Sequence, residues 1–164
     1  MTAASLRPAG TGDLDAVTRV FLACWHNSYA GLLPPDVRDL YTLDTARELW
    51  RRVALDHLLV AEAAGRGVLG MVRFGTDPDD PGCGHVYSLY VDPDSQGLGL
   101  GRTLLTAAGE ALVARGYAQA TLWVFADNTA AMAFYARLGW QPDGATRTEA
   151  AYRLPEIRLR RRLP

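Results

Sequence analysis

The stretch Val86–Leu105 has the residue types and spacing best suited to binding a charged ligand. An apolar, strand-like run over 86–91 is followed by a short polar turn and then by QGLGLGR at 96–102, which leads into an apolar-periodic helix. In a strand, glycine-rich loop and helix start, unpaired N–H groups and the positive end of the helix dipole converge on one point. This arrangement predicts an anion site, and the expected anion is a phosphate.

Two common phosphate loops do not fit this stretch. A nucleotide-hydrolase loop needs Lys in GxxxxGK[ST], and all seventeen basic residues of the chain are Arg. A dinucleotide loop needs GxGxxG, whose last glycine would fall on Arg102 or Leu104 when counted from Gly97 or Gly99. The pattern that remains is Gln96-x-x-Gly99-x-Gly101.

A second stretch of interest is NTAAMAFYARLGW at 128–140. Asn128 is a candidate N-cap for a helix over 129–138, and Gly139 is a candidate stop. Tyr135 shares an apolar stripe with Phe134 and Leu138, so periodicity alone favours a packing role for it, and Phe134 is expected in the core.

Together these stretches resemble the GNAT superfamily of N-acetyltransferases. The glycine pattern is similar to the family's acyl-CoA pyrophosphate loop, LYVDP at 89–93 to the passage before it, and 128–140 to its second cofactor motif. The resemblance covers the whole chain, least well over 31–56 and after Asp143. It implies an α/β fold in one domain, 1–164, with a mixed, mostly antiparallel sheet of six to seven strands and about four helices.

The resemblance also implies an activity: transfer of acetyl from acetyl-CoA to a primary amine of a small molecule or peptide. Direct attack is expected, because neither Cys24 nor Cys83 nor any Ser stands in a triad-like context. An inactive GNAT-fold acyl-CoA-binding sensor or interaction module is the alternative, and a longer acyl chain is a third possibility. Family members often pair, so a homodimer is possible.

The implied cofactor site has two parts. The N–H groups from Leu98 to Thr103 would bind the pyrophosphate, and the main chain beside the strand would bind the pantetheine arm. Gln96 would order the loop or touch phosphate, and Arg102 would add charge or face solvent. The implied residues are Leu89, Tyr90, Val91, Gln96, Gly97, Leu98, Gly99, Leu100, Gly101, Arg102, Thr103 and Asn128.

Two residues are implied in catalysis. The Tyr135 hydroxyl would protonate the departing thiolate, and the Leu89 N–H could receive the oxyanion. His85 stands where relatives often place a glutamate base, and its intrinsic pKa near neutrality suits that role, directly or through water. A strand-edge histidine without a function is the alternative.

The sequence gives weaker signals for the acceptor pocket than for the cofactor site. Tyr29, Ser88 and Tyr152 are the candidates for it, whereas Trp25 and Leu33 are expected in the core. The segment 75–84 predicts an exposed loop whose aspartates are solvated, although Asp77, Asp79 and Asp80 could draw a cationic amine.

Periodicity and turn residues predict an α/β layer with the order β-α-α-β-β-β-α-β-α-β-β. The expected strands cover 6–9, 57–63, 68–74, 86–91, 118–125, 140–147 and 156–163. The expected helices cover 12–29, 43–56 and 129–138, together with a helix that follows the glycine-rich loop and ends at about 115, and a helical turn is expected at 36–41.

Bulk properties set limits on partners and location. A length of 164 residues suits one domain, and a net charge of −1 excludes a basic field for nucleic acid or a membrane surface. Two cysteines without CxxC spacing predict neither a disulfide scaffold nor a metal site. The N-terminus lacks a signal-peptide pattern and no apolar run is long enough to span a membrane, so a cytoplasmic protein is expected.

Overall fold

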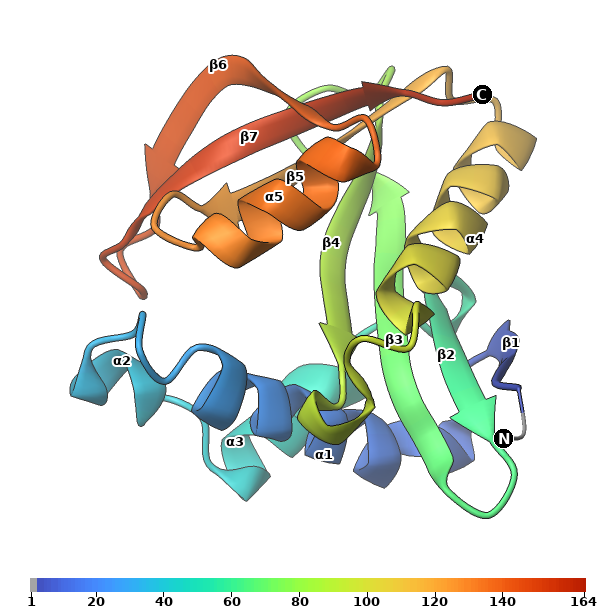
Figure 1. The fold of residues 1–164 in the computed structure, drawn as a ribbon, viewed down its shortest axis with the longest axis vertical. Helices are drawn as coiled ribbons and strands as arrows, with labels where there is room; N and C mark the ends of the chain where they lie inside the picture. Colours follow the sequence, from blue (N-terminus) through green and yellow to red (C-terminus); the bar gives the residue numbers. More distant parts are fainter. Residues whose placement is uncertain (1–2) are drawn as a thin grey trace. The chain divides into compact units, whose positions relative to one another are not determined.

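A computed structural model describes residues 3–164 (Figure 1). The sheet has seven strands in the order β1-β2-β3-β4-β5-β7-β6 and is mostly antiparallel, which confirms the predicted fold class. The strands are β1 (Ser5–Pro8), β2 (Leu58–Ala63), β3 (Gly67–Thr76), β4 (Gly84–Val91), β5 (Gln119–Phe125), β6 (Gln141–Thr148) and β7 (Pro155–Arg162). The helices are α1 (Leu14–Ala23), α2 (Pro35–Arg38), α3 (Leu43–Arg51), α4 (Leu100–Ala114) and α5 (Thr129–Arg137).

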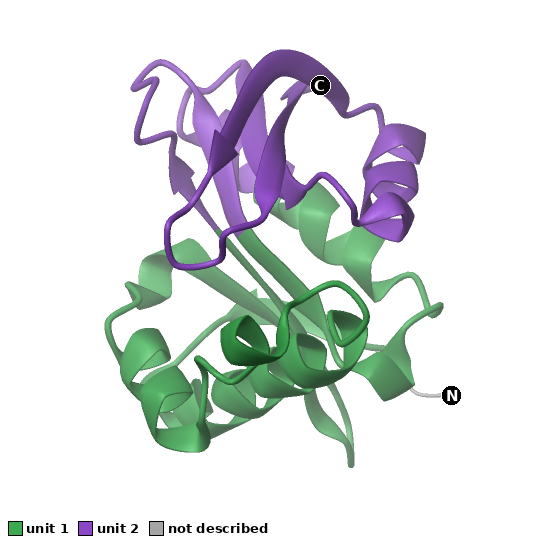
Figure 2. Cartoon of the chain, turned by 90° about the vertical axis from the view of Figure 1, so that its left-hand side faces the viewer, with its two compact units in different colours: residues 1–73, 88–108 green, residues 74–87, 109–164 purple. Residues whose placement is uncertain are grey.

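The chain divides into two compact units (Figure 2). Unit 1 comprises residues 1–73 and 88–108, and unit 2 comprises residues 74–87 and 109–164. Three elements, β3, β4 and α4, contribute residues to both units.

In unit 1, an aromatic cluster holds α1, α3 and the end of β4 together. Phe21 of α1 lies at its centre, with ring centroids 5.7 Å from Trp50 of α3 and 5.3 Å from Tyr90 of β4. Trp25 lies 5.8 Å away in the segment after α1. Trp25 and Leu33 are both buried, as the sequence predicts. Burial of these large rings is a main source of stability for the unit.

The predicted helix over 12–29 is broken into three parts. A 3₁₀ turn (Thr11–Asp13) leads into α1, and a π-helical segment (Cys24–Ser28) follows it. The N–H of Tyr29 donates to the carbonyl of Cys24 at 3.2 Å, which closes the wider turn. A π-helical segment keeps the helical apolar spacing almost intact, so periodicity could not reveal it. The helix predicted over 43–56 ends early, at Arg51.

In unit 2, β7 lies between β5 and β6 and pairs antiparallel with both. Leu122 and Val124 of β5 and Leu159 of β7 are buried, whereas Trp123 and Arg158 pair on the opposite face. The first residues of β4 pair parallel with β5, Gly84–Val86 against residues 120–122.

The prediction that 75–84 is an exposed loop is wrong at four buried residues, Gly75, Asp77, Cys83 and Gly84. Asp77 is 1% exposed and Cys83 is fully buried, because the Asp77 N–H donates to the Cys83 carbonyl at 2.9 Å and closes the loop. β3 also continues to Thr76 and β4 begins at Gly84. Loop composition predicted solvation, but the carboxylate of Asp77 has a buried partner in Thr121 of β5.

Gly70 of β3 is a position where a side chain would not fit. A Cβ there would lie 3.0 Å from Leu104 Cδ1 and 3.0 Å from the Tyr90 carbonyl oxygen. We expect Gly70→Ala to lower the free energy of unfolding by about 1–3 kcal/mol, because the backbone of β4 cannot yield as a side chain can. Urea denaturation measures this change.

The matched control is Gly12→Ala, where a Cβ would meet nothing within 4 Å. We expect this control to stay within about 0.5 kcal/mol of the wild type. Equal effects of the two substitutions would contradict the close approach of β3 and β4.

Candidate active site

The glycine-rich loop of unit 1 leaves several backbone donors at the start of α4. Gly97 and Gly99 both have φ of +80°, a conformation that only glycine adopts without strain. The Thr103 N–H donates to the Gly99 carbonyl at 3.0 Å. The N–H groups of residues 100–102 precede that bond and therefore have no acceptor inside the helix. With the helix dipole, they form an anion-binding terminus of the predicted kind.

Side chains from distant parts of the sequence hold this loop. Gln96 Nε2 lies 3.2 Å from Ser28 Oγ and 3.3 Å from the Val91 carbonyl, so Gln96 orders the loop. Arg66 donates to the hydroxyl of Ser95, which is fully buried, at 2.9 Å. Sequence reasoning missed Ser28 and Arg66, because they lie 68 and 29 residues from their partners and no local pattern joins them. Arg102 is exposed.

The end of β4 presents its main chain on alternate edges. The Asp92 N–H donates to the Leu69 carbonyl of β3 at 2.8 Å, so by the two-residue period Tyr90 also faces β3. Leu89 and Val91 then present their N–H and C=O groups at the other edge. The Val91 carbonyl already accepts from Cys24 Sγ at 3.0 Å and from Gln96.

Because of this alternation, Tyr90 faces a different edge of β4 from Leu89 and Val91, the neighbouring predicted cofactor residues. Its main chain is directed towards β3, and its ring lies 5.3 Å from Phe21 and 6.3 Å from Trp50. The placement favours a packing role for Tyr90. Leu89 and Val91 have the edge that a pantetheine arm would need.

In unit 2, His85 lies in a buried row of polar side chains. His85 is 4% exposed, and its Nδ1 lies 2.7 Å from Thr121 Oγ1. Thr121 in turn donates to the Asp77 carboxylate, and the His85 ring makes an edge contact with Tyr87 at 4.7 Å. His85 is the second residue of β4, which lies between β3 and β5 in the sheet. Thr121 was not among the predicted site residues, and Asp77 was considered only as a loop charge that could draw a cationic amine.

The environment of His85 overturns one prediction about its chemistry. Burial lowers the pKa of His85 to about 4, although the carboxylate of Asp77 acts in the opposite direction. The expectation of an imidazole that titrates near neutrality is therefore wrong. His85 is neutral at pH 7 and can accept a proton, but it is a weak base.

Asn128 and Tyr135 lie at the start and near the end of α5 in unit 2. The Asn128 side chain accepts from the Ala131 N–H at 3.1 Å, which confirms its N-cap role. Tyr135 is half-buried, with its ring 5.1 Å from Phe134 and 6.3 Å from Trp140. None of the described residues of α5 is buried, so Phe134 is not the core residue that the sequence predicts. The apolar stripe of α5 keeps area that a ligand could cover.

The predicted acceptor residues are distributed over both units. Tyr29 and Ser88 belong to unit 1 with the glycine loop, and both are half-buried. Tyr152 belongs to unit 2 with His85, Asn128 and Tyr135, and its ring lies 6.0 Å from Phe125.

An aromatic–arginine group in unit 2 also went unpredicted. The guanidinium of Arg147 lies 4.4 Å from the centroid of Trp123, and that of Arg158 lies 5.7 Å from it. Carboxylates pair with both: Glu156 with Arg147 at 3.1 Å, and Asp143 with Arg158 at 2.7 Å.

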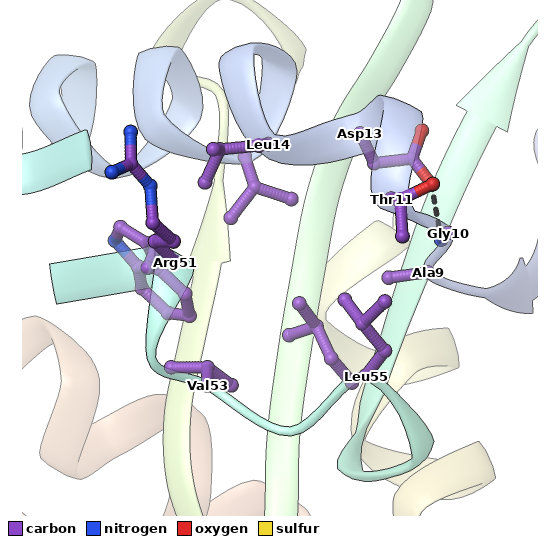
Figure 3. Close-up of a pocket in the computed structure, with 11 residues that line it drawn as sticks. Ala9, Gly10, Thr11, Asp13, Leu14, Arg51, Val53 and Leu55 are labelled. Carbon is purple, nitrogen blue, oxygen red and sulfur yellow. Dashed lines mark hydrogen bonds between the residues drawn. The ribbon is translucent and has the colours of Figure 1, made fainter. Parts of the chain in front are cut away.

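A separate cavity of about 210 Å³ lies in unit 1 (Figure 3). Its lining comes from the segment after β1, from α1, from α3 and from the segment leading into β2, and it includes no predicted site residue. Asp13 at its rim accepts from the Gly10 N–H at 2.7 Å and pairs with Arg7. The carboxylate of Asp13 thus already has partners within the protein.

Neither thiol of the chain is suited to nucleophilic attack. Cys24 and Cys83 are both free and buried. Burial raises the pKa of Cys24 to about 12 and also raises the pKa of Cys83. Over residues 3–164, no group of three or more His, Cys, Asp or Glu side chains is arranged to hold a metal ion.

The profile of the Acetyltransferase (GNAT) family matches residues 15–140. The chain belongs to this family. That confirms the resemblance inferred from the loop and from residues 128–140. GNAT acetyltransferases use acetyl-CoA, so the prediction of this cofactor is confirmed at the level of the family.

Among curated GNAT relatives, a mycothiol acetyltransferase from Saccharopolyspora erythraea is 39% identical over 137 residues, which are 82% of this chain and 42% of that protein. Another from Amycolatopsis mediterranei is 37% identical over 136 residues, 78% of this chain and 42% of that protein. The chain thus spans less than half the length of these relatives.

Solved structures show the same fold. The PaiA N-acetyltransferase from Thermoplasma acidophilum, in complex with coenzyme A, has a TM-score of 0.76 and 18% identity, with 98% of this chain and 99% of that chain covered. A GCN5-related N-acetyltransferase from Rhodopseudomonas palustris has a TM-score of 0.78 and 24% identity, with 99% and 98% covered. In the described part of this GNAT chain, no helix has the length and apolar character to cross a bilayer.

The buried His85 makes stability depend on pH. Its pKa is about 4 in the folded chain and near 6.5 when unfolded, so between these values only the unfolded chain binds the proton. Stability is full above pH 6.5 and falls as the pH decreases towards 4, by roughly 1.4 kcal/mol per unit at most. Chemical denaturation at pH 7 and pH 5 should show a loss about 2 kcal/mol larger for the wild type than for His85→Gln. Parallel pH dependences of the two proteins would contradict the burial of a neutral His85.

Proposed function

We propose that this GNAT chain is an N-acetyltransferase that moves the acetyl group of acetyl-CoA to a primary amine of a small molecule or peptide. The geometry of the glycine loop carries the proposal, because positive φ at Gly97 and Gly99 leaves the first N–H groups of α4 to an anion. The pyrophosphate of the cofactor is such an anion. Family membership supplies the reaction class.

The residues of unit 1 would bind the donor. The N–H groups of residues 98–102 would hold the pyrophosphate, and the exposed guanidinium of Arg102 would add positive charge. The predicted N–H of Thr103 is not among these donors, because it donates to the Gly99 carbonyl. Leu89 and Val91 would pair with the pantetheine arm as an added strand does, through the edge that faces away from β3. The Val91 carbonyl has two donors already, so the N–H of Val91 and both groups of Leu89 would make these bonds. The Leu89 N–H would also receive the oxyanion.

The residues of unit 2 would move the protons. The hydroxyl of Tyr135 would protonate the thiolate that leaves, and Nε2 of His85 would take a proton from the acceptor amine, directly or through water. Asn128 would contact the pantetheine side while it caps α5. Direct attack by the amine is expected because both thiols are buried and protonated.

For the acceptor, we propose a class of compounds, primary amines, and not a single compound. Tyr29, Ser88 and Tyr152 would line its pocket. Because the relatives described above are mycothiol acetyltransferases, a mycothiol-related amine is one acceptor to include in a panel of amines, beside amino acids, polyamines, aminoglycosides and peptide N-termini. A cytoplasmic location and a homodimer also remain predictions.

The test measures release of free thiol from acetyl-CoA in the presence of each amine. We expect Tyr135→Phe to lower kcat about 100-fold with the best acceptor, because the thiolate loses its proton donor, while the Kd for CoA stays unchanged. The matched control is Tyr117→Phe. Tyr117 follows α4, and its hydroxyl is hydrogen-bonded to the hydroxyl of Thr76, so its removal should leave kcat near the wild-type value.

Two outcomes would contradict this proposal. CoA binding without turnover of any amine would favour the alternative of an acyl-CoA-binding sensor. Equal kcat for Tyr135→Phe and Tyr117→Phe would remove Tyr135 from the reaction.

A further inference from the structure

A chain of three buried polar side chains ends at His85. Asp77 comes from the loop after β3, Thr121 from β5 and His85 from β4, and their exposed fractions are 1%, 0% and 4%. Thr121 Oγ1 lies 2.7 Å from His85 Nδ1 and donates to the Asp77 carboxylate, which is itself 3.8 Å from Nδ1. Three elements thus converge on one nitrogen of one imidazole.

The number of protons available fixes the direction of these bonds. Burial opposes ionisation of Asp77, but hydrogen bonds from the Thr121 hydroxyl and from the Asp79 N–H hold its pKa below the usual range. The carboxylate therefore only accepts, and the single hydroxyl proton of Thr121 is directed to it. The other acceptor near this hydroxyl is the Gly84 carbonyl at 3.5 Å, and a bond to it would have the same consequence. Thr121 Oγ1 must accept from Nδ1–H.

We infer that Asp77 and Thr121 are positioning residues that hold neutral His85 as the Nδ1–H tautomer and leave Nε2 as its proton-accepting atom. The inference rests on the proposed function for the role of His85 in transfer, but the tautomer itself follows from the hydrogen bonds. The hydrogen bond between the His85 ring and Thr121 is made at Nδ1.

The ring is restrained on a second side as well. Tyr87 makes an edge contact with the imidazole at 4.7 Å, and its own hydroxyl donates to the Thr76 carbonyl, next to Asp77. Asp77 is fixed in turn by the Asp79 N–H at 2.8 Å and by the closed loop. Rotation of the imidazole would break the bond to Thr121 and leave a buried N–H without a partner, which is costly.

With Nε2 free to accept, the proton of the acceptor ammonium has a defined destination. The N–H bond of the acceptor ammonium breaks as a new bond forms between that proton and Nε2, and the amine keeps the electron pair with which it attacks the acetyl carbonyl. The imidazolium has both nitrogens protonated, and Nδ1–H still donates to Thr121, whose hydroxyl still donates to Asp77. Asp77 and Asp79 stabilise that cation, and the charges of Arg147 and Arg158 oppose it. The proton returns to water after transfer.

Long-range ¹H–¹⁵N correlation spectra of the imidazole test the inference on the full chain at pH 7. The wild type should show a protonated Nδ1 and an unprotonated Nε2 for His85, assigned by comparison with His85→Gln. Thr121→Val keeps the shape and removes the hydroxyl, and should shift His85 towards the Nε2–H tautomer. Thr121→Ser keeps the hydroxyl and should restore the wild-type pattern.

Kinetics on the same proteins separate positioning from folding. We expect Thr121→Val to lower kcat about 10-fold or more with an unchanged Kd for CoA, and Thr121→Ser to recover most of it. A protonated Nε2 in the wild type would overturn the inference, and so would identical spectra for wild type and Thr121→Val. If Thr121→Val does not fold, the wild-type and Thr121→Ser spectra still show whether Nδ1 or Nε2 of His85 carries the proton.

Failure of the tautomer inference can be distinguished from failure of the proposed function. The predicted tautomer without thiol release on any amine would contradict the proposed transfer and leave the tautomer assignment in place. Thiol release by a wild type with the opposite tautomer would overturn only the inference.

Discussion

The backbone N–H groups at the start of α4 have no acceptor inside the helix, and the rest of the donor site depends on that constraint. Two glycines at φ of +80° carry the chain into the helix, and Ser28, Arg66 and Gln96 fix the loop. Most of these contacts use side-chain donors and acceptors. They order the loop without consuming the main-chain donors of residues 100–102 that an anion would need.

Local signals in the sequence predicted the features that local physics determines. The N-cap role of Asn128, the order of the strands and helices and the position of the glycine loop follow from residues a few positions apart. The contacts that shape the site do not follow from such local signals. Ser28 and Gln96, Arg66 and Ser95, and Asp77 and Thr121 lie 68, 29 and 44 residues apart, so only the folded sheet brings them together.

His85 shows why residue type alone gives the wrong chemistry. The intrinsic pKa of a histidine suggested a group that titrates near neutrality, whereas burial in β4 lowers it to about 4. Likewise, the aspartate-rich loop suggested solvated charges, but Asp77 is buried against Thr121. In both cases the deciding quantity is burial, which depends on the packing of β3, β4 and β5 and has no signature in spacing or composition.

Backbone amide NMR tests most directly whether the start of α4 binds the pyrophosphate of the acyl donor. Titration with CoA should shift the ¹H–¹⁵N signals of residues 98–103, whereas pantetheine, which lacks the pyrophosphate, should leave them in place at the same concentration. Saturation with CoA that moves signals elsewhere but not those of residues 98–103 would contradict the account.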